Sequence, residues 1–389
     1  MEKIFNNTQV AFSLKSDTEL DRAYFLFKLI DSQPLVRIGT AVTNFAIKAH
    51  LPVEGLIRAT VFDHFCGGVS ENDCLPVVDK MFTKGVSSVL DYSVEGKEEE
   101  AQFDAALEMT LKTIDFAEEK KSIPFAVFKP TGFGRFELYE KLGEGQKLNA
   151  EEQAEWERVV ARFDTVCKAA HGKDVALLID GEESWMQDAA DDLVAEMMKK
   201  YNKEKAIVFN TLQMYRWDRL DYLKKLHQEA KEEGFYIGMK LVRGAYMEKE
   251  IKRAEEKGYP SPICATKEAT DVNYDAAVLY MVEHLEKMAI FAGTHNELSS
   301  YKLMDLMRAS NIAKNDDRIW FGQLYGMSDN ISYNLAENGY NVAKYLPFGP
   351  VRDVMPYLIR RAEENTSVAG QTSRELTLIK TERDRRKGK

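Results

Sequence analysis

Two adjacent arginines, Arg360 and Arg361, are the residues whose types and spacing point most directly to chemistry in this sequence. They end a short helical pattern that follows an apolar segment and a Phe-Gly-Pro turn. An arginine guanidinium group grips a carboxylate through two parallel hydrogen bonds. Two such groups at a strand-turn-helix junction therefore predict a pocket for a small carboxylic acid. The alternative is a solvated arginine-glutamate pair on a helix surface, for example with Glu364.

Eight short apolar segments with the character of β-strands supply the elements that could position such a pocket. Longer helical patterns, such as residues 271–287 and 299–310, separate most of them. The eight segments cover residues 85–92, 125–129, 175–180, 206–210, 236–242, 288–294, 318–322 and 342–346. Parallel strands that alternate with helices describe a (β/α)8 barrel of the TIM type, which is the predicted fold class.

The remaining segments predict appendages to this barrel. Residues 1–85 have helical apolar spacing and predict an N-terminal helical region, and residues 86–365 form the predicted barrel. Residues 133–171 are too many for a simple connection and predict a helical insertion after the second strand. Residues 366–389 are basic and predict a flexible tail, for which a solvated terminus is favoured over attraction to anionic lipid.

Polar residues follow the predicted strands where each strand ends, which is where the chemistry of such barrels is found. In chain order they are Asp91 and Glu95, Lys129, Asp180, Gln213, Lys240 with Arg243 and Tyr246, Thr294 with His295, Gln323, and Tyr345. This arrangement favours the pocket over the solvated helix pair. A Lys129–Asp180 ion pair that only stabilises the barrel mouth remains open.

The charges of this rim can balance one another. Buried cations need partners, because an unpaired charge in an apolar pocket is costly. Arg360, Arg361 and Lys129 are the cations, and the compensating acids are Asp180, Glu95 and Glu364. A Glu95–Arg360 salt bridge could also act as a gate.

Several functional classes are disfavoured. The net charge of -10, without an internal basic segment, argues against nucleic acid as a partner. The dispersed cysteines and histidines predict no metal site. No signal peptide, transit peptide or apolar segment of bilayer length is evident, so we expect a cytoplasmic protein, with peripheral contact at the inner membrane left open. A GxGxxG loop after a strand and an evident nucleophile-base pair are both absent, which suits a reaction whose hard step belongs to a cofactor.

With these residues in view, the chain resembles the proline dehydrogenase family, the flavin barrels that oxidise L-proline. The resemblance runs from about residue 86 to residue 365. Its motifs, in order, are LDYSVE at 90–95, FKPT at 128–131, IDGEE at 179–183, LQMY at 212–215, KLVRGAY at 240–246, GTHN at 293–296, QLYGM at 323–327, YLPFG at 345–349 and YLIRRAEEN at 357–365. Met247 stands where some members have a tryptophan, which resembles the monofunctional, eukaryotic-like branch.

The resemblance implies a non-covalently bound FAD and a role for each matching residue. Arg360, Arg361 and Lys129 would hold the substrate carboxylate, and Tyr345, Tyr246 and Leu324 would contact the ring. The flavin would be held by Gln213, Lys240, Arg243, Thr294, His295 and Glu364. Glu95 would be the gate partner of Arg360, and Asp180 a supporting acid whose expected partner is Lys129.

The reaction implied is oxidation of L-proline to 1-pyrroline-5-carboxylate by hydride transfer to FAD, the first step of proline catabolism. Electrons would pass to a quinone-type acceptor through a peripheral membrane contact. A separate pyrroline-5-carboxylate dehydrogenase would take the product, since the chain is short for a fused second enzyme. Two alternatives stay open: a 4-hydroxyproline dehydrogenase, against which Tyr345 argues, and a flavin-free barrel that only binds a small carboxylate.

Overall fold

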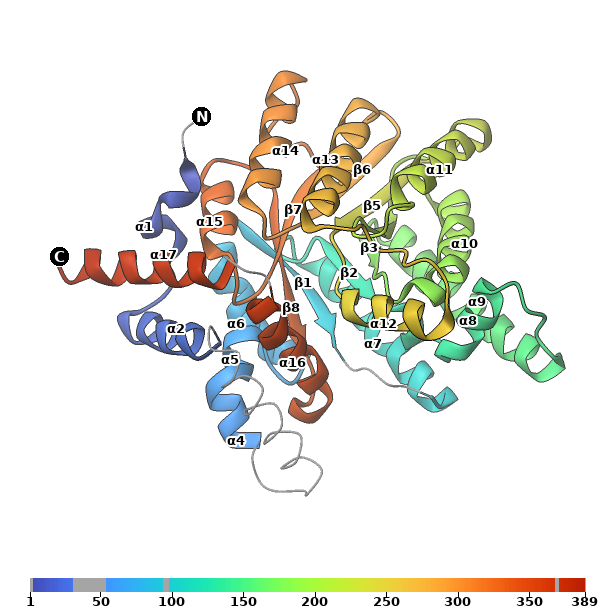
Figure 1. Cartoon of the computed structure of the whole chain (residues 1–389), viewed down its shortest axis with the longest axis horizontal. Helices are drawn as coiled ribbons and strands as arrows, with labels where there is room; N and C mark the ends of the chain where they lie inside the picture. Colours follow the sequence, from blue (N-terminus) through green and yellow to red (C-terminus); the bar gives the residue numbers. More distant parts are fainter. Residues whose placement is uncertain (1–2, 31–53, 94–97, 368–370, 389) are drawn as a thin grey trace. The chain divides into compact units, whose positions relative to one another are not determined.

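The computed structural model describes residues 3–30, 54–93, 98–367 and 371–388. Its eight strands pair in parallel and in chain order around a closed barrel, which confirms the predicted fold class (Figure 1). The strands are β1 (Val86–Tyr92), β2 (Phe125–Phe128), β3 (Ala176–Ile179), β4 (Val208–Gln213), β5 (Ile237–Val242), β6 (Met288–Gly293), β7 (Ile319–Leu324) and β8 (Val342–Phe348).

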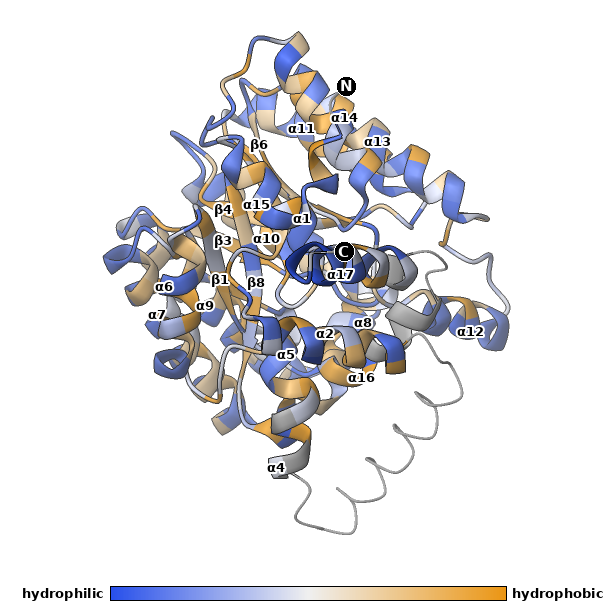
Figure 2. Cartoon of the chain, turned by 90° about the vertical axis from the view of Figure 1, so that its left-hand side faces the viewer, coloured by the Kyte–Doolittle hydropathy of each residue, from blue (hydrophilic) through white to orange (hydrophobic). Residues whose placement is uncertain are grey.

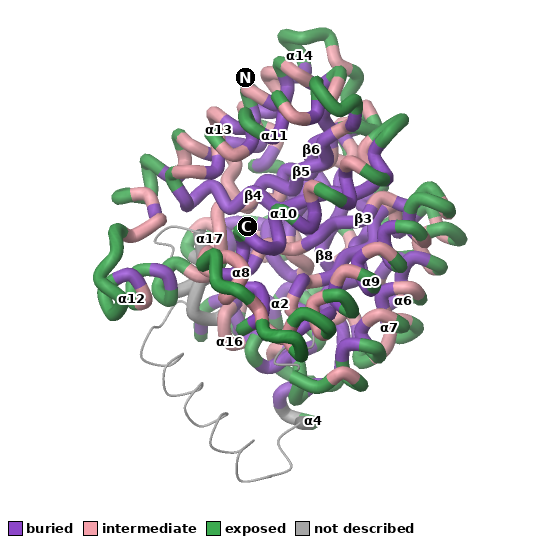
Figure 3. The backbone as a smooth tube through the Cα atoms, turned by 90° about the vertical axis from the view of Figure 1, so that its right-hand side faces the viewer, coloured by how far each residue is buried: buried purple, intermediate pink, exposed green. Residues whose placement is uncertain are grey.

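The strands are buried almost throughout, as expected for parallel strands covered on both faces (Figure 3). Three of them end later than predicted. β4 continues to Gln213 because it pairs with β5 as far as Val242, and β8 continues to Phe348 because it pairs with β1 as far as Tyr92. β7 likewise extends to Leu324. As a result, two predicted site residues, Gln213 and Leu324, are the last residues of their strands.

Two compact units make up the chain, residues 1–95 with 323–389 and residues 96–322, and each is described by itself. The predicted domain boundaries at residues 85 and 365 stay predictions. The second unit contains the helices α7 (Glu100–Glu119), α8 (Phe136–Gly143), α9 (Ala150–Gly172), α10 (Ser184–Tyr201), α11 (Arg219–Glu233), α12 (Met247–Lys257), α13 (Lys267–Glu283) and α14 (Glu297–Ala309).

Helices α8 and α9 both lie between β2 and β3, as predicted for the insertion. The start of α9 is fixed by Asn149, whose side chain accepts hydrogen bonds from the N–H groups of Glu151 and Glu152. The carboxylate of Glu152 accepts the N–H of Asn149 in return, which completes a capping box. The insertion is therefore a defined pair of helices.

In the first unit, the described residues before β1 are mostly helical. The α-helices among the described residues of this unit are α1 (Thr8–Ala11), α2 (Asp17–Ile30), α4 (Glu54–Ile57), α5 (Asp63–Phe65), α6 (Glu71–Phe82), α15 (Asp329–Glu337), α16 (Val351–Ser367) and α17 (Gln371–Arg386). Over the described residues, none of the helices combines the length and the apolar character that a membrane span requires.

Helix α17 corrects the prediction of a flexible tail. Its residues are mostly hydrophilic (Figure 2), yet Leu378 and Ile379 are buried in one cluster with Phe12, Leu20 and Phe27. Three of the basic residues that suggested a solvated terminus, Arg383, Arg385 and Arg386, are instead paired with carboxylates of the unit. Arg386 contacts Glu382 and Asp17, for example, so the charges help to hold the helix in place. The basic composition of the segment therefore did not predict the burial of Leu378 and Ile379 or the ion pairs of its arginines.

A buried charge cluster in the same unit contains Lys15, Asp329, Lys344 and Glu375. Lys344 on β8 is fully buried and lies 2.9 Å from the carboxylate of Asp329, which also faces Lys15 at 3.2 Å. Burial would raise the pKa of Asp329, but the two lysines, Lys344 the stronger, lower it to about 2. Glu375 of α17 joins the cluster by accepting the N–H of Ser328 at 3.1 Å. This cluster ties α17 to the segment that follows β7.

Candidate functional site

The predicted site residues of the second unit lie at the carboxyl ends of strands β2 to β6. Lys129 follows β2, Asp180 follows β3, Gln213 ends β4, Lys240 lies in β5, and Thr294 follows β6. Arg243 directly follows β5, and Tyr246 and His295 lie in the short segments that connect β5 to α12 and β6 to α14. This is the position that the barrel fold assigns to binding and catalytic groups.

Lys240 and Asp180 form an ion pair. The ammonium group of Lys240 contacts the Oδ1 atom of Asp180, and the side chains are only 7% and 15% exposed. A lysine so deeply buried needs a partner of this kind, because an uncompensated charge would be costly. Lys240 from β5 is thus a partner of Asp180, and the expected pairing of Asp180 with Lys129 stays a prediction.

Arg243 is held by four groups of the second unit. Its guanidinium group donates to Asp271 at 2.7 Å, to the hydroxyl of Thr294 at 2.7 Å and to the hydroxyl of Ser299 at 3.0 Å. It also lies over the ring of Tyr274, 4.6 Å from the centroid. The arginine is thereby fixed in one orientation at the end of β5.

The contacts of Arg243 also affect the pKa of Asp271. Burial tends to raise the pKa of Asp271, but hydrogen bonds from Lys267 and Arg243 outweigh that effect and lower it. Asp271 therefore stays ionised beside Arg243. Neither Asp271 nor Ser299 is among the residues predicted for the site. The sequence marks them only as polar residues near the starts of α13 and α14.

Gln213 contributes a buried amide at the end of β4. The side chain is 2% exposed, and its Oε1 atom has no hydrogen-bond donor among the described residues. Leaving a buried acceptor without a donor costs about 1–3 kcal/mol. A bound group that presents an N–H to this oxygen would remove that cost, so the amide is suited to a ligand.

The loop after β5 is shaped by Gly244. This residue has a φ of +133°, and a Cβ atom there would lie 2.5 Å from the ring of Tyr215. The N–H of Tyr215 in turn donates to the carbonyl of Arg243 at 2.7 Å. Only glycine permits this close approach, which sets the path of the chain between Arg243 and Tyr246.

Tyr246 and His295 are both half-buried at the start of a helix. Tyr246 precedes α12, and the ammonium group of Lys249 lies 5.4 Å from its ring centroid. His295 lies between Thr294 and Asn296, the residue that caps α14 with its side chain. Tyr246 thus lies between β5 and α12, and His295 lies between β6 and α14.

The predicted residues of the first unit lie on α16, β7 and β8. Arg361 is buried, and its guanidinium carbon lies 5.2 Å from the ring centroid of Tyr357, while Arg360 is half-buried. Tyr345 on β8 is buried, and its carbonyl accepts the N–H of Tyr325 at 2.8 Å. Arg361 is therefore not a solvated helix charge.

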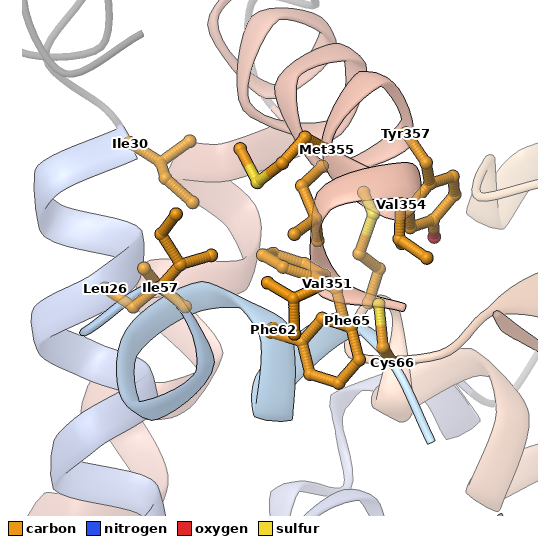
Figure 4. Packing of buried hydrophobic residues seen from close by; sticks show 12 residues of the cluster. Leu26, Ile30, Ile57, Phe62, Phe65, Cys66, Val351, Val354, Met355 and Tyr357 are labelled. Carbon is orange, nitrogen blue, oxygen red and sulfur yellow. The ribbon is translucent and has the colours of Figure 1, made fainter. Parts of the chain in front are cut away.

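An apolar cluster fixes helix α16 within this unit (Figure 4). Val351, Val354, Met355, Tyr357 and Leu358 supply the face of α16. Leu26 and Ile30 of α2 and residues of the segment from Ile57 to Cys66 pack against that face, and Leu324 lies at its edge. The cluster brings the predicted ring contact Leu324 to the same helix as the two arginines.

Two predicted site residues fall outside the described parts of the structure. Glu95, the predicted gate, lies in the segment 94–97, and the side chain of Glu364 is not described, although α16 extends past it. Their assigned roles stay predictions.

Comparison with known proteins gives one family for most of the chain. The sequence model described as "Proline dehydrogenase" matches residues 74–374. "Carbapenem antibiotics biosynthesis protein CarD" of Pectobacterium carotovorum subsp. carotovorum is 37% identical over 353 residues, which cover 90% of this chain and 91% of that protein. "Proline dehydrogenase 1, mitochondrial" of Arabidopsis thaliana is 31% identical over 407 residues, covering 91% of this chain and 80% of that protein.

Other similar proteins are longer than this chain. The human protein named "Proline dehydrogenase 1, mitochondrial" is 40% identical over 236 residues, which are 60% of this chain and 39% of the human one. Among solved structures, proline utilization A (PutA) from Bdellovibrio bacteriovorus, inactivated by N-propargylglycine, aligns with a TM-score of 0.73 at 21% identity. That alignment covers 95% of this chain and 39% of the PutA chain, and it supports the fold.

Proposed function

This chain belongs to the proline dehydrogenase family, and we propose that it oxidises L-proline to 1-pyrroline-5-carboxylate in the first step of proline catabolism. One observation carries the proposal. The family match over residues 74–374 includes every residue predicted for the site, from Glu95 to Glu364. The described ones lie within barrel strands, in the segments that follow them, or on α16.

FAD is the proposed cofactor, and the described residues fit it. Gln213 offers a buried amide oxygen that lacks a donor, as an N–H of a flavin ring would require. Lys240 and Arg243 bring positive charge to the same strand ends, which suits an anionic reduced ring. When bound, FAD would supply the hydride acceptor. Its proposed ligands are Gln213, Lys240, Arg243, Thr294, His295 and Glu364.

The protein side chains would bind and orient the imino acid. Arg360, Arg361 and Lys129 would hold the carboxylate, since guanidinium and ammonium groups are its natural partners. Tyr345, Tyr246 and Leu324 would pack against the ring and exclude water. The substrate amine would lose its proton before the hydride leaves the adjacent ring carbon. Holding the reacting atoms in this way can lower a barrier by about 7–11 kcal/mol.

The remaining parts of the proposal concern what lies around this reaction. Electrons would pass to a quinone-type acceptor, which requires peripheral contact with the inner membrane. A cytoplasmic location is proposed beside it. The product would go to a separate pyrroline-5-carboxylate dehydrogenase. Glu95 would act as a gate by pairing with Arg360, and Asp180 would hold Lys240 in place.

The test is optical. Purified protein should be yellow, and anaerobic addition of L-proline should bleach the flavin absorption with formation of one pyrroline-5-carboxylate per flavin. A colourless protein that still binds proline would identify a flavin-free carboxylate binder. Faster turnover of 4-hydroxyproline than of proline, measured on the same preparation, would identify the hydroxyproline enzyme instead.

A second candidate function is the same oxidation of proline as a step in a biosynthetic pathway. The Pectobacterium relative, which matches over 91% of its own length, carries a name from carbapenem biosynthesis. Growth on proline as sole nitrogen source, with and without the intact gene, separates the two candidates. Only a catabolic enzyme should be required for that growth.

A further inference from the structure

The turn that carries Lys129 has few restraints of its own. Directly after β2, residues Pro130–Gly132 form a single 3-10 turn. The N–H of Gly132 donates to the carbonyl of Lys129 at 2.8 Å, and the N–H of Phe133 donates to the carbonyl of Pro130 at 3.0 Å. One isolated turn of this kind is marginal in water. Its conformation must therefore be held by groups outside it.

Glu182 holds the turn from the segment that follows β3. Its carboxylate accepts the N–H of Thr131 at 3.0 Å with one oxygen and the hydroxyl of Thr131 at 2.7 Å with the other. Glu182 is 6% exposed, and its own N–H donates to the side chain of Gln187 at 2.8 Å. Glu182 is thus held through its backbone N–H and through its carboxylate. Because of these contacts it restrains Thr131, which lies two residues from Lys129.

The helical insertion holds the same turn from the other direction. The fully buried Tyr139 of α8 donates its hydroxyl to the carbonyl of Pro130 at 2.7 Å. The buried Arg162 of α9 donates to the carbonyl of Phe133 at 3.1 Å. The ring of Phe133 stacks on Phe128 of β2, with 4.4 Å between centroids. One side chain from each helix of the insertion thus donates a hydrogen bond to the backbone at this turn.

The charge of Lys129 is felt at Glu182. Burial raises the pKa of Glu182 to about 7, and the positive charge of Lys129 is the strongest of the effects that limit the rise, followed by the hydrogen bonds from Thr131. Glu183 and Tyr139 also interact electrostatically with Glu182. The ammonium group of Lys129 therefore lies within electrostatic reach of the group that fixes its turn.

We propose that Glu182 is a positioning residue for substrate binding, which together with Tyr139 of the helical insertion holds the turn so that Lys129 is oriented toward the substrate carboxylate before the substrate arrives. Preorganised groups bind more tightly because less conformational entropy is lost on binding. The insertion between β2 and β3 then has a function, which is to support the carboxylate site. This inference rests on the proposed function, in which Lys129 binds the carboxylate of proline.

Substitution of Glu182 gives the main test, with proline kinetics measured on the flavin-loaded enzyme. Glu182→Ala removes both hydrogen bonds to Thr131 and should raise the KM for proline about tenfold or more, while kcat changes less than about threefold. Glu182→Gln can still accept the N–H and can donate to the hydroxyl, so its KM should stay within about threefold of the wild type. The inhibition constant of cyclopentanecarboxylate, which has a carboxylate but no amine, should rise in parallel with KM.

Two milder substitutions with matched controls protect the test against misfolding of the alanine variant. Thr131→Val should raise KM about threefold or more, whereas Thr165→Val, on the exposed side of α9, should not. Tyr139→Phe should also raise KM about threefold or more. Its control is Tyr201→Phe, which removes a hydroxyl that bonds Asp164 at 2.7 Å, away from the turn.

The outcomes separate this inference from the proposed function. Wild-type protein that is not bleached by proline overturns the proposed function and this inference with it. Wild-type protein that turns over proline, with KM unchanged in Glu182→Ala or in both Thr131→Val and Tyr139→Phe, overturns the inference alone. Equal losses in kcat for Glu182→Ala and Glu182→Gln would also overturn it, because they would assign Glu182 to the chemical step.

Discussion

The ammonium group of Lys240, on β5, contacts the carboxylate of Asp180, the residue that directly follows β3. β4 lies between these two strands in the barrel order, so the ion pair links two strands that do not pair through their backbones. The buried amide of Gln213 ends the strand between them. A positive charge is thereby kept at the proposed flavin site without being exposed to water.

We expect Asp180→Asn to lower the free energy of unfolding by about 3 kcal/mol, because it leaves a buried lysine without its carboxylate. Asp174→Asn is the matched control. It removes the partner of Lys205 from a pair in which both side chains are more than half exposed, 58% and 68%, so a loss below about 1 kcal/mol is expected. Urea unfolding measures both. Equal losses of unfolding free energy in the two variants would show that the buried Lys240–Asp180 pair stabilises the protein no more than an exposed pair does.

Arg360→Ala should raise the KM for proline about a hundredfold while flavin stays bound, because a charged hydrogen-bonding partner of the carboxylate is lost. Arg352→Ala, on the exposed side of the same helix, should leave KM unchanged. Steady-state kinetics and flavin absorbance of the purified variants provide the measurement. A wild-type KM in Arg360→Ala would place the carboxylate clamp elsewhere.

Gly244→Ala should destabilise the protein by about 3 kcal/mol or more, because the new methyl group overlaps the ring of Tyr215 and the positive φ is strained. Gly258→Ala provides the comparison. That residue has a φ of +74°, but no atom lies within 4 Å of the added Cβ, so only the conformational cost of about 1 kcal/mol should appear. Urea unfolding measures the loss of unfolding free energy in both variants. Equal losses would show that the ring of Tyr215 can move away from the added methyl group.

The stability of the protein should depend on pH through Glu375. Burial and the nearby Asp329 raise the pKa of Glu375 to about 7 in the folded protein, against an ordinary value of 4.5. Between these values the folded state keeps a proton that the unfolded chain releases. The contribution of Glu375 is therefore complete below about pH 4.5 and is lost as the pH rises toward 7.

Glu375→Gln cannot ionise, so this loss should be absent from the variant. Its unfolding free energy relative to the wild type should increase by up to about 3 kcal/mol between pH 5 and pH 8. Glu337→Gln, at an exposed position at the end of α15, should run parallel to the wild type over the same range. Parallel curves for Glu375→Gln would mean that Glu375 is not protonated in the folded state.

The barrel was predictable because strand periodicity is local. Each strand is a short apolar run, and polar residues mark its end, so both the fold and the strand-end position of residues such as Asp180 and Thr294 follow from one sequence. The ends of β4 and β8 were less predictable, since pairing with a neighbouring strand decides where they stop. Helix α17 was missed because its burial depends on partners more than 300 positions away, such as Thr8 and Glu382, whose side chains lie 3.0 Å apart.

The sequence predicted which residues belong to the site and at which strand ends they lie. It did not predict the side chains with which they form ion pairs and hydrogen bonds. The sequence suggested Lys129 as the partner of Asp180, and it did not suggest the ion pair with Lys240, which comes from β5, two strands further along the barrel. The support of Arg243 by Asp271 and Ser299 comes from two different helices and leaves no sequence spacing to find. Glu182 stood within a recognised motif, yet only its contact with Thr131 reveals a use for it.

The packing of α17 matters for anyone who expresses part of this protein. A fragment cut at residue 374, where the family match ends, would omit Leu378 and Ile379 and uncover the apolar side chains of Phe12 and Phe27. It would also discard the carboxylate of Glu375, which caps the segment after β7. Such a fragment should aggregate even though its catalytic motifs are intact, so the family boundary is a poor guide to where the folding unit stops.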